Sequence, residues 1–292
     1  MSPRVCLRKW TVVSFIIGLL GLAVLSTSSL WAQTGYSHYR TITISHAKVP
    51  NTDLSGFPFL FSSTDATLAT TANGGHVTSA SGYDIIFTSD AAGTQRLNHE
   101  IESYNAATGQ FIAWVNLPTL SHTTDTVIYM FYGNSSVNSS QENKAAVWDS
   151  NYIGVWHLGA GGSLSGADST SNHNSSADTG ANVSATAGMI GGGASLDGSS
   201  GSYLDMGTST TLDLTGAFTL SAWYKKTGYT GAWEIFMSKC AADACNYELA
   251  IDGPNQDIEG VQNGSLIESG IVPALNQWHH VVEVSNGANV YF

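Results

Sequence analysis

The sequence has few charged side chains and very few basic ones. Lysine and arginine number 10 in 292 residues, against 22 acidic residues, and Arg4, Arg8 and Lys9 supply three of the ten. The chain beyond these three therefore has 22 acidic and seven basic side chains, a net charge near −15 with histidine neutral. Nucleic acids and anionic membrane surfaces bind proteins through clustered lysine and arginine. This composition excludes both as expected partners.

Cysteine is also scarce, with three residues in the whole chain. Cys6 stands near the N-terminus, and Cys240 and Cys245 bound the short loop CAADAC between the alternating runs WEIFMSK and NYELAID. Two thiols that face each other across a hairpin form a disulfide in an oxidising compartment. A zinc site would need more ligands nearby, and the nearest histidine is His279. We therefore predict a structural disulfide.

A long membrane-spanning run is missing as well. The longest apolar run, Thr11 to Leu25, is shorter than the roughly 20 residues that a spanning helix needs. Basic residues precede it and a short polar stretch ending at Ala32 follows it, which is the order of a secretory signal peptide. We expect residues 1–32 to be a signal peptide cleaved near Ala32, and the protein to be secreted or on the cell surface. The alternative is an uncleaved leader, which would be the chain's only attachment to a membrane.

No stretch after the leader has a sustained apolar period of 3.6 residues. Alternation with period two recurs instead, in YRTITIS, YDIIFTS, FIAWVNL and TVIYMFYG, with glycine- and asparagine-rich turns between the runs. Hydrophobic residues make up 42% of the chain, which is enough to form cores and argues against disorder. Short alternating runs at this spacing predict a β-sandwich or jelly roll over residues 36–133. We expect residues 33–134 to fold independently.

A polar segment, residues 134–151, then predicts a linker with one short helical turn. A second series of alternating runs follows, in YIGVWHL, AFTLSAWYKK, WEIFMSK, NYELAID and QWHHVVEVS. It predicts a second jelly roll over residues 152–292, with Trp156, Trp223 and Trp278 in its core. Because the last residues begin another strand, we expect this domain to be incomplete at its C-terminus. The predicted fold is all-β, with two β-sandwich or jelly-roll domains after a signal peptide.

Two resemblances follow from these segments. The pieces YRTITISHAKVPNTDLSGFPFLF, GYDIIFTSDAAGTQRLNHEIESYN and TVIYMFYGN resemble the bacterial domain of unknown function numbered 2341. The ordered pieces GVWHLG, ADSTSNHN, GMIGGGASLDGSSGSYLDMG, FTLSAWYK and NQWHHVVEV resemble the concanavalin A-like lectin/glucanase superfamily, in its laminin-G-like branch. The first resemblance implies an exported protein without an agreed activity. The second implies a jelly roll that binds sugars or proteins, and sometimes calcium.

The catalytic pattern of the glucanases in that superfamily is not found in residues 152–292. Those enzymes carry carboxylates at alternate strand positions, so that an acid and a nucleophile flank the glycosidic bond. Glu248 and Asp252 are four residues apart instead. Glu100 and Glu102 do alternate, but a half-exposed strand with Ile101 on its other face explains them equally well. We expect both glutamates on a solvated face, and we predict no catalytic residue.

Binding residues are expected in loops. Tyr229 and Trp233 flank the loop TGYTGAW, where aromatic rings either stack on a sugar ring or cap a core. Calcium is the one cofactor considered, because oxygen-bearing residues group in two turns. Turn formation explains these residues equally well. The calcium candidates are Asp168 and Asn172 in one turn, and Asp243 and Asn246 in the other.

These features predict an exported, non-catalytic binding or adhesion protein that recognises a glycan or an extracellular protein. One alternative is an accessory binding region of a larger secreted enzyme that acts on glycosides. Another is a structural spacer of a surface protein.

Overall fold

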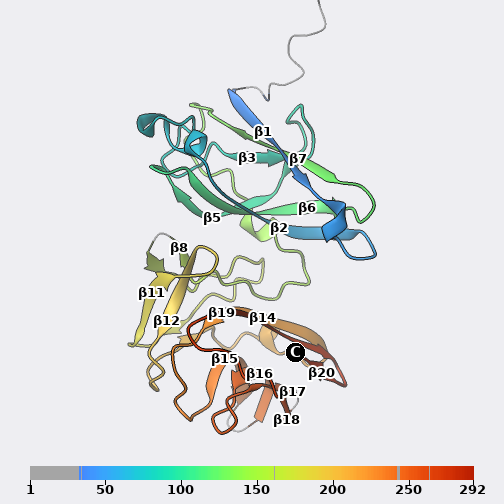
Figure 1. Cartoon of the computed structure of the whole chain (residues 1–292), viewed down its shortest axis with the longest axis vertical. Coiled ribbons are helices and arrows are strands. Elements are labelled where there is room, and N and C mark those ends of the chain that lie inside the picture. Colours follow the sequence, from blue (N-terminus) through green and yellow to red (C-terminus); the bar gives the residue numbers. More distant parts are fainter. Residues whose placement is uncertain (1–32, 34, 161, 242–243, 263) are drawn as a thin grey trace, which may run out of the picture.

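The computed structural model describes residue 33 and residues 35–160, 162–241, 244–262 and 264–292 (Figure 1). The predicted signal peptide lies outside the described residues. Within them the fold is all-β, as expected, and five 3₁₀ helices accompany the strands, at His46–Lys48, Ala66–Leu68, Thr71–Asn73, Lys144–Ala146 and Thr210–Leu212. No helix in this part of the chain has the length and apolar character needed to span a membrane.

The first sandwich consists of two sheets, with strand orders β1-β7-β3-β4 and β2-β6-β5. Their bounds are β1 (His38–Ile44), β2 (Leu54–Thr64), β3 (Ile86–Thr88), β4 (Arg96–Leu97), β5 (His99–Asn105), β6 (Gln110–Leu120) and β7 (Thr126–Tyr132). Period-two alternation turns one face of each sheet inward, so Phe87, Phe111 and Met130 are fully buried between the sheets. The four alternating runs identified in this part of the sequence all form strands.

Residues 134–151, expected as a linker, pack against the first sandwich. The segment has the one short helical turn that was predicted, at Lys144–Ala146. Val147 and Trp148 at its end are buried, and the side chain of Asn116 on β6 donates a hydrogen bond of 2.9 Å to the carbonyl of Val147. The polar composition predicted a free joint, whereas the apolar pair at its end attaches the segment to the sheet.

Residues 152–196 contain short strands and lie between the two sandwiches (Figure 1). Their elements are β8 (Gly159–Ala160), β9 (Ser163–Leu164), β10 (Asp178–Thr179), β11 (Val183–Ala187) and β12 (Gly192–Leu196), and β10 pairs with β13 (Leu204–Asp205). The run YIGVWHL, predicted as a strand, forms only one isolated bridge, between Trp156 and Asp168. This run lacks a strand partner. Hydrogen bonds that involve side chains fix it instead, such as those from the Val155 N–H to Asp168 and from the Trp156 indole to the carbonyl of Asn174.

The second sandwich pairs the sheet β14-β19-β20 with the sheet β15-β16-β17-β18. The strands are β14 (Ala217–Lys225), β15 (Glu234–Ala241), β16 (Ala244–Ile251), β17 (Ile258–Gln262), β18 (Ser265–Glu268), β19 (Trp278–Asn286) and β20 (Val290–Tyr291). Phe218 and Leu220 of the first sheet pack on Leu249 and Ile251 of the second. Trp223, expected in this core, is 43% exposed because it alternates with the inward residues of β14.

A disulfide joins Cys240 to Cys245, as predicted. The two residues are opposite each other at the ends of β15 and β16. The bond therefore closes the hairpin between these strands.

Candidate functional site

Glu100 and Glu102 on β5 form the centre of a buried polar cluster, which corrects the expectation that they face solvent. Both glutamates are at most 3% exposed. A register shift between Ile101 and Ser103 marks a β-bulge, and the side chain of Glu142 accepts a hydrogen bond of 2.7 Å from the Ile101 N–H there. Glu100 and Glu102 do share one face of β5. The segment that follows the first sandwich covers that face through Trp148 and His157.

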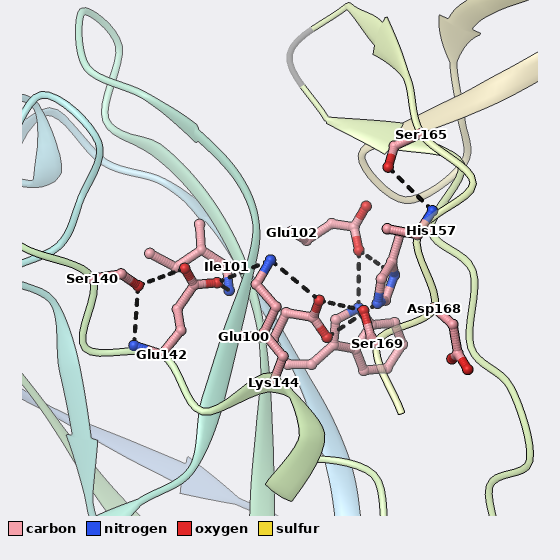
Figure 2. A network of polar contacts seen from close by, with 12 residues as sticks. Glu100, Ile101, Glu102, Ser140, Glu142, Lys144, His157, Ser165, Asp168 and Ser169 are labelled. Atoms are coloured by element: carbon pink, nitrogen blue, oxygen red, sulfur yellow. Dashed lines mark hydrogen bonds and ion pairs between the residues drawn. The ribbon is translucent and has the colours of Figure 1, made fainter. Parts of the chain in front are cut away.

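The imidazole of His157 lies between the two carboxylates (Figure 2). Its Nε2 is 3.2 Å from Glu100, and its Nδ1 is 2.6 Å from Glu102. The indole N–H of Trp148 donates to Glu100 at 3.0 Å, and that of Trp114 donates to Glu102 at 3.1 Å. We call these five residues the clasp, because they join β5 and β6 to Trp148 and His157 in the chain that follows the first sandwich.

The charges of the clasp stabilise one another. Burial acts to lower the pKa of His157, but the hydrogen bonds that its ring donates to Glu100 and Glu102, with the charges of these carboxylates, outweigh burial and raise that pKa to about 9. Burial likewise acts to raise the pKa of Glu100, but the hydrogen bonds and charge of His157, with the hydroxyl of Ser169, lower it to about 2. The imidazole is therefore a cation near neutral pH, and the Glu100 carboxyl is an anion.

These ionisation states decide what the clasp can do. A general base must be free to accept a proton near the operating pH, and a general acid must release one there. Both ring nitrogens of His157 are engaged by Glu100 and Glu102, and both glutamates are almost fully buried. The arrangement supports a structural connection between the first sandwich and residues 152–174.

Asp168, one of the calcium candidates, organises the turn beside the clasp. Its Oδ1 accepts hydrogen bonds of 2.9 Å from the N–H groups of Val155 and Thr170. Its Oδ2 accepts bonds of 2.8 Å from the Thr170 hydroxyl and the Asn174 N–H. The turn places the Ser169 hydroxyl 2.6 Å from Glu100. Both oxygens of Asp168 are thus occupied by donors of the protein.

The other calcium candidates do not complete a metal site among the described residues. The Asn172 amide donates to the carbonyls of Tyr152 and Ile153, and Asn246 lies half-buried in β16. Asp243 lies outside the described residues. The one described group with suitable spacing for a metal is Cys240, Cys245 and Glu248, and its two sulfurs are joined in the disulfide. No calcium site is derived from these contacts.

Tyr229 and Trp233, the predicted binding residues, have different surroundings. The Tyr229 ring packs against the second core, its hydroxyl donates to the carbonyl of Pro273, and the Lys226 ammonium lies 4.7 Å from its ring centre. Trp233 is 55% exposed just before β15. Trp233 is therefore the member of this pair with a ring face available to a ligand.

Trp233 belongs to the outer face of the sheet β15–β18, which faces away from the second core. In this sheet Ile235, Ala250, Glu259 and Glu268 are opposite one another on successive strands, so they share a face. Leu266 belongs to the neighbouring row of opposed residues on the same face. The side chains of Ile235 and Leu266 are both more than half exposed. Large apolar side chains thus surround the centre of this face.

A buried carboxylate without hydrogen bonds of normal geometry lies at that centre. Glu259 is 0% exposed, and neither of its carboxylate oxygens has a hydrogen-bond partner that meets standard distance and angle limits. Burial, followed by the charges of Asp252 and Glu248, raises the pKa of Glu259 to about 7, although the nearby Trp233 side chain favours the charged form. Trp233 thus lies beside a buried, largely neutral carboxyl group, and its own ring is the exposed part of this pair.

Family models match two parts of the chain. Residues 81–152 match the Domain of unknown function (DUF2341), and residues 197–292 match the Concanavalin A-like lectin/glucanases superfamily. The two matches follow one another in this order along the chain. The outer face of β15–β18 lies within the concanavalin A-like match, whereas His157 and Ser169 lie between the two matches. Searches of curated proteins and of solved structures found no match.

Two of the important side chains could not be singled out from the sequence. His157 stood in a run predicted as a strand, and Glu259 stood in DIEGVQ, which has no strong alternation. One feature of the sequence could have drawn attention to His157. It directly follows Trp156, in an alternating run that has no second run nearby to form a hairpin with. Glu259 gave no comparable signal, because its contact with the Trp233 side chain joins residues 26 positions apart.

Proposed function

We propose that the chain is an exported, non-catalytic binding region whose concanavalin A-like sandwich recognises a carbohydrate through the outer face of β15–β18. The observation that carries the proposal is the exposed Trp233 ring, with the exposed side chains of Ile235 and Leu266 on the same sheet. An indole ring packs well on the apolar face of a sugar. The Cys240–Cys245 disulfide supports export, because such bonds persist in oxidising compartments.

The other roles considered make different predictions about binding. An accessory region of a larger glycoside-active enzyme would also bind sugars through this face. A protein ligand would use the exposed Ile235 and Leu266 as apolar anchors. A structural spacer would bind neither.

A glycan array with the intact exported protein tests the proposal, and two tryptophan variants locate the binding. We expect Trp233→Ala to weaken binding by about 1–3 kcal/mol, the range for removing an aromatic stacking partner. Trp223→Ala is the matched control, because Trp223 is a tryptophan of similar exposure on the outer face of the other sheet. Equal loss in both variants, or no glycan bound by the unsubstituted protein, would contradict the proposal.

A further inference from the structure

The clasp contains a slot in which a cation bridges two carboxylates. We call its walls, Glu100, Glu102, Trp114 and Trp148, the acidic slot. The centre of the His157 ring lies 6.2 Å from that of Trp114 and 5.8 Å from that of Trp148. The two carboxylates approach different ring nitrogens, at 3.2 Å and 2.6 Å. The His157 ring is tilted by 37° against Trp114 and by 46° against Trp148, so the indoles border the slot without stacking on its occupant. An occupant must carry hydrogen-bond donors on two edges to reach both carboxylates.

The carboxylates of the slot are positioned by residues other than its occupant. Trp148 and Ser169 donate to Glu100 at 3.0 Å and 2.6 Å, and Trp114 donates to Glu102 at 3.1 Å. None of these bonds involves the imidazole. The acceptor oxygens are consequently directed toward the slot by the rest of the structure.

The slot also requires a positive charge. The side chains of Glu100 and Glu102 are 3% and 1% exposed, and two buried carboxylates are unfavourable without a cation between them. Lys144 lies 3.6 Å from Glu100, but it is 52% exposed and is equally close to Glu142. Its charge is therefore solvated and shared, which leaves the occupant of the slot as the main compensating cation.

We propose that the acidic slot is a binding site for a planar organic cation of the imidazolium or guanidinium class, and that His157 is its intramolecular ligand. An alkylammonium group is a compact charge that lacks the two donors fixed on different edges of one plane, which the two carboxylates engage in His157. The imidazole side chain is 19% exposed, so the slot opens to solvent on one side. Binding of this ring connects the DUF2341 region to the segment that leads into the second sandwich.

Replacing His157 by alanine and supplying free imidazole tests the site. We expect imidazole to bind the His157→Ala protein at least about tenfold more tightly than the unsubstituted protein, whose slot is filled. Binding is measured by isothermal titration and by the rise in the thermal midpoint of the variant. It should weaken as the pH rises above the pKa of an unperturbed imidazole side chain, about 6.5, because the neutral ring carries one donor.

Two control measurements make the test specific. 1-Methylimidazole, which has one donor fewer, should bind the His157→Ala protein more weakly than imidazole does. Adding Glu102→Gln to the His157→Ala protein should abolish its preference for the charged form of imidazole. Equal binding of imidazole by the unsubstituted and His157→Ala proteins, or by the His157→Ala proteins with and without Glu102→Gln, overturns the proposal.

A measurement on the unsubstituted protein covers the case in which His157→Ala does not fold. We expect proton–nitrogen NMR to show both ring N–H groups of His157 protected from solvent exchange at pH 7.5. A ring that has lost one of these protons at that pH overturns the proposal.

Discussion

Removing one of the buried charges of Glu100, Glu102 and His157 should lower the stability of the fold more than removing one charge of a surface ion pair does. Exposed pairs contribute about 0–1 kcal/mol, because water solvates each charge nearly as well as the partner does. Removing one member of a buried pair leaves the other charge without compensation in a medium of low polarity, which costs about 3–5 kcal/mol. The clasp is of the second kind, since its glutamates are almost fully buried.

We therefore expect Glu102→Gln to lower the free energy of unfolding of the first sandwich by about 3–5 kcal/mol. The amide keeps the size of the side chain but cannot compensate the His157 charge. Urea unfolding followed by tryptophan fluorescence measures this change. Glu268→Gln is the control, because that glutamate is exposed and such a substitution changes stability by about 0.5 kcal/mol or less. Similar small effects in both variants would show that the charge of Glu102 is unimportant.

At the scale of elements, the sandwich β14–β20 carries two carboxylates that resist ionisation. Burial, with the charge of Glu248, raises the pKa of Glu283 to about 8, and Glu259 has a raised pKa of about 7. Neither side chain has a hydrogen-bond partner for its two oxygens within standard limits. From about pH 4.5 to pH 8 the folded state thus keeps protons that the unfolded chain releases.

This difference fixes the sign of the pH dependence. The contribution of both groups is fully present below the ordinary glutamate pKa of about 4.5 and is lost as the pH rises through about 7 and 8. We expect the thermal midpoint of the second sandwich to be lower at pH 8.5 than at pH 5. The double variant Glu259→Gln, Glu283→Gln should reduce that decrease. A midpoint that rises with pH, or a decrease that the double variant leaves unchanged, would contradict the assignment.

The hairpin β15–β16 depends on its disulfide to a small extent. Because Cys240 and Cys245 close a loop of only a few residues, the bond restricts the unfolded chain little, and its reduction should cost about 2 kcal/mol. Alkylation of the exported protein without reductant should label neither residue. Quantitative labelling of both would show that the bond does not form. After reduction, denaturant unfolding measures the loss.

The strands with clear period-two alternation were predictable, and the packing between distant segments was not. FIAWVNL and TVIYMFYG became β6 and β7 because a strand with one buried face alternates whatever its partner is. YIGVWHL alternates too, but its backbone bonds to the turn around Asp168, and its histidine enters the clasp. Periodicity describes one segment at a time, so it cannot indicate which exposed face another segment will cover.

At the scale of the whole molecule, the first folding unit extends beyond the strands that define it. Val147 and Trp148 are buried beside β5 and β6, and His157 and Ser169 hydrogen-bond to Glu100 and Glu102 of β5. A chain that stops at residue 134 would expose Glu100, Glu102 and their apolar surroundings. We therefore expect a larger independently folding unit than residues 33–134.

A pair of truncated chains tests this boundary. We expect residues 33–176 to unfold cooperatively and to resist limited proteolysis, because they contain the complete clasp and the turn around Asp168. Residues 33–134 should be degraded much faster under the same conditions. If the shorter chain were as resistant and as cooperative as the longer one, the covering segment would contribute nothing to the fold of the first sandwich.

The central functional claim is that the ligand lies on the outer face of β15–β18. Amide hydrogen exchange with and without a glycan selected on the array tests it most directly, because the method reports protection along the whole chain at once. We expect added protection around Trp233, β15 and β17, with β14, β19 and the first sandwich unchanged. Protection confined to the first sandwich or to β14 and β19 would contradict it.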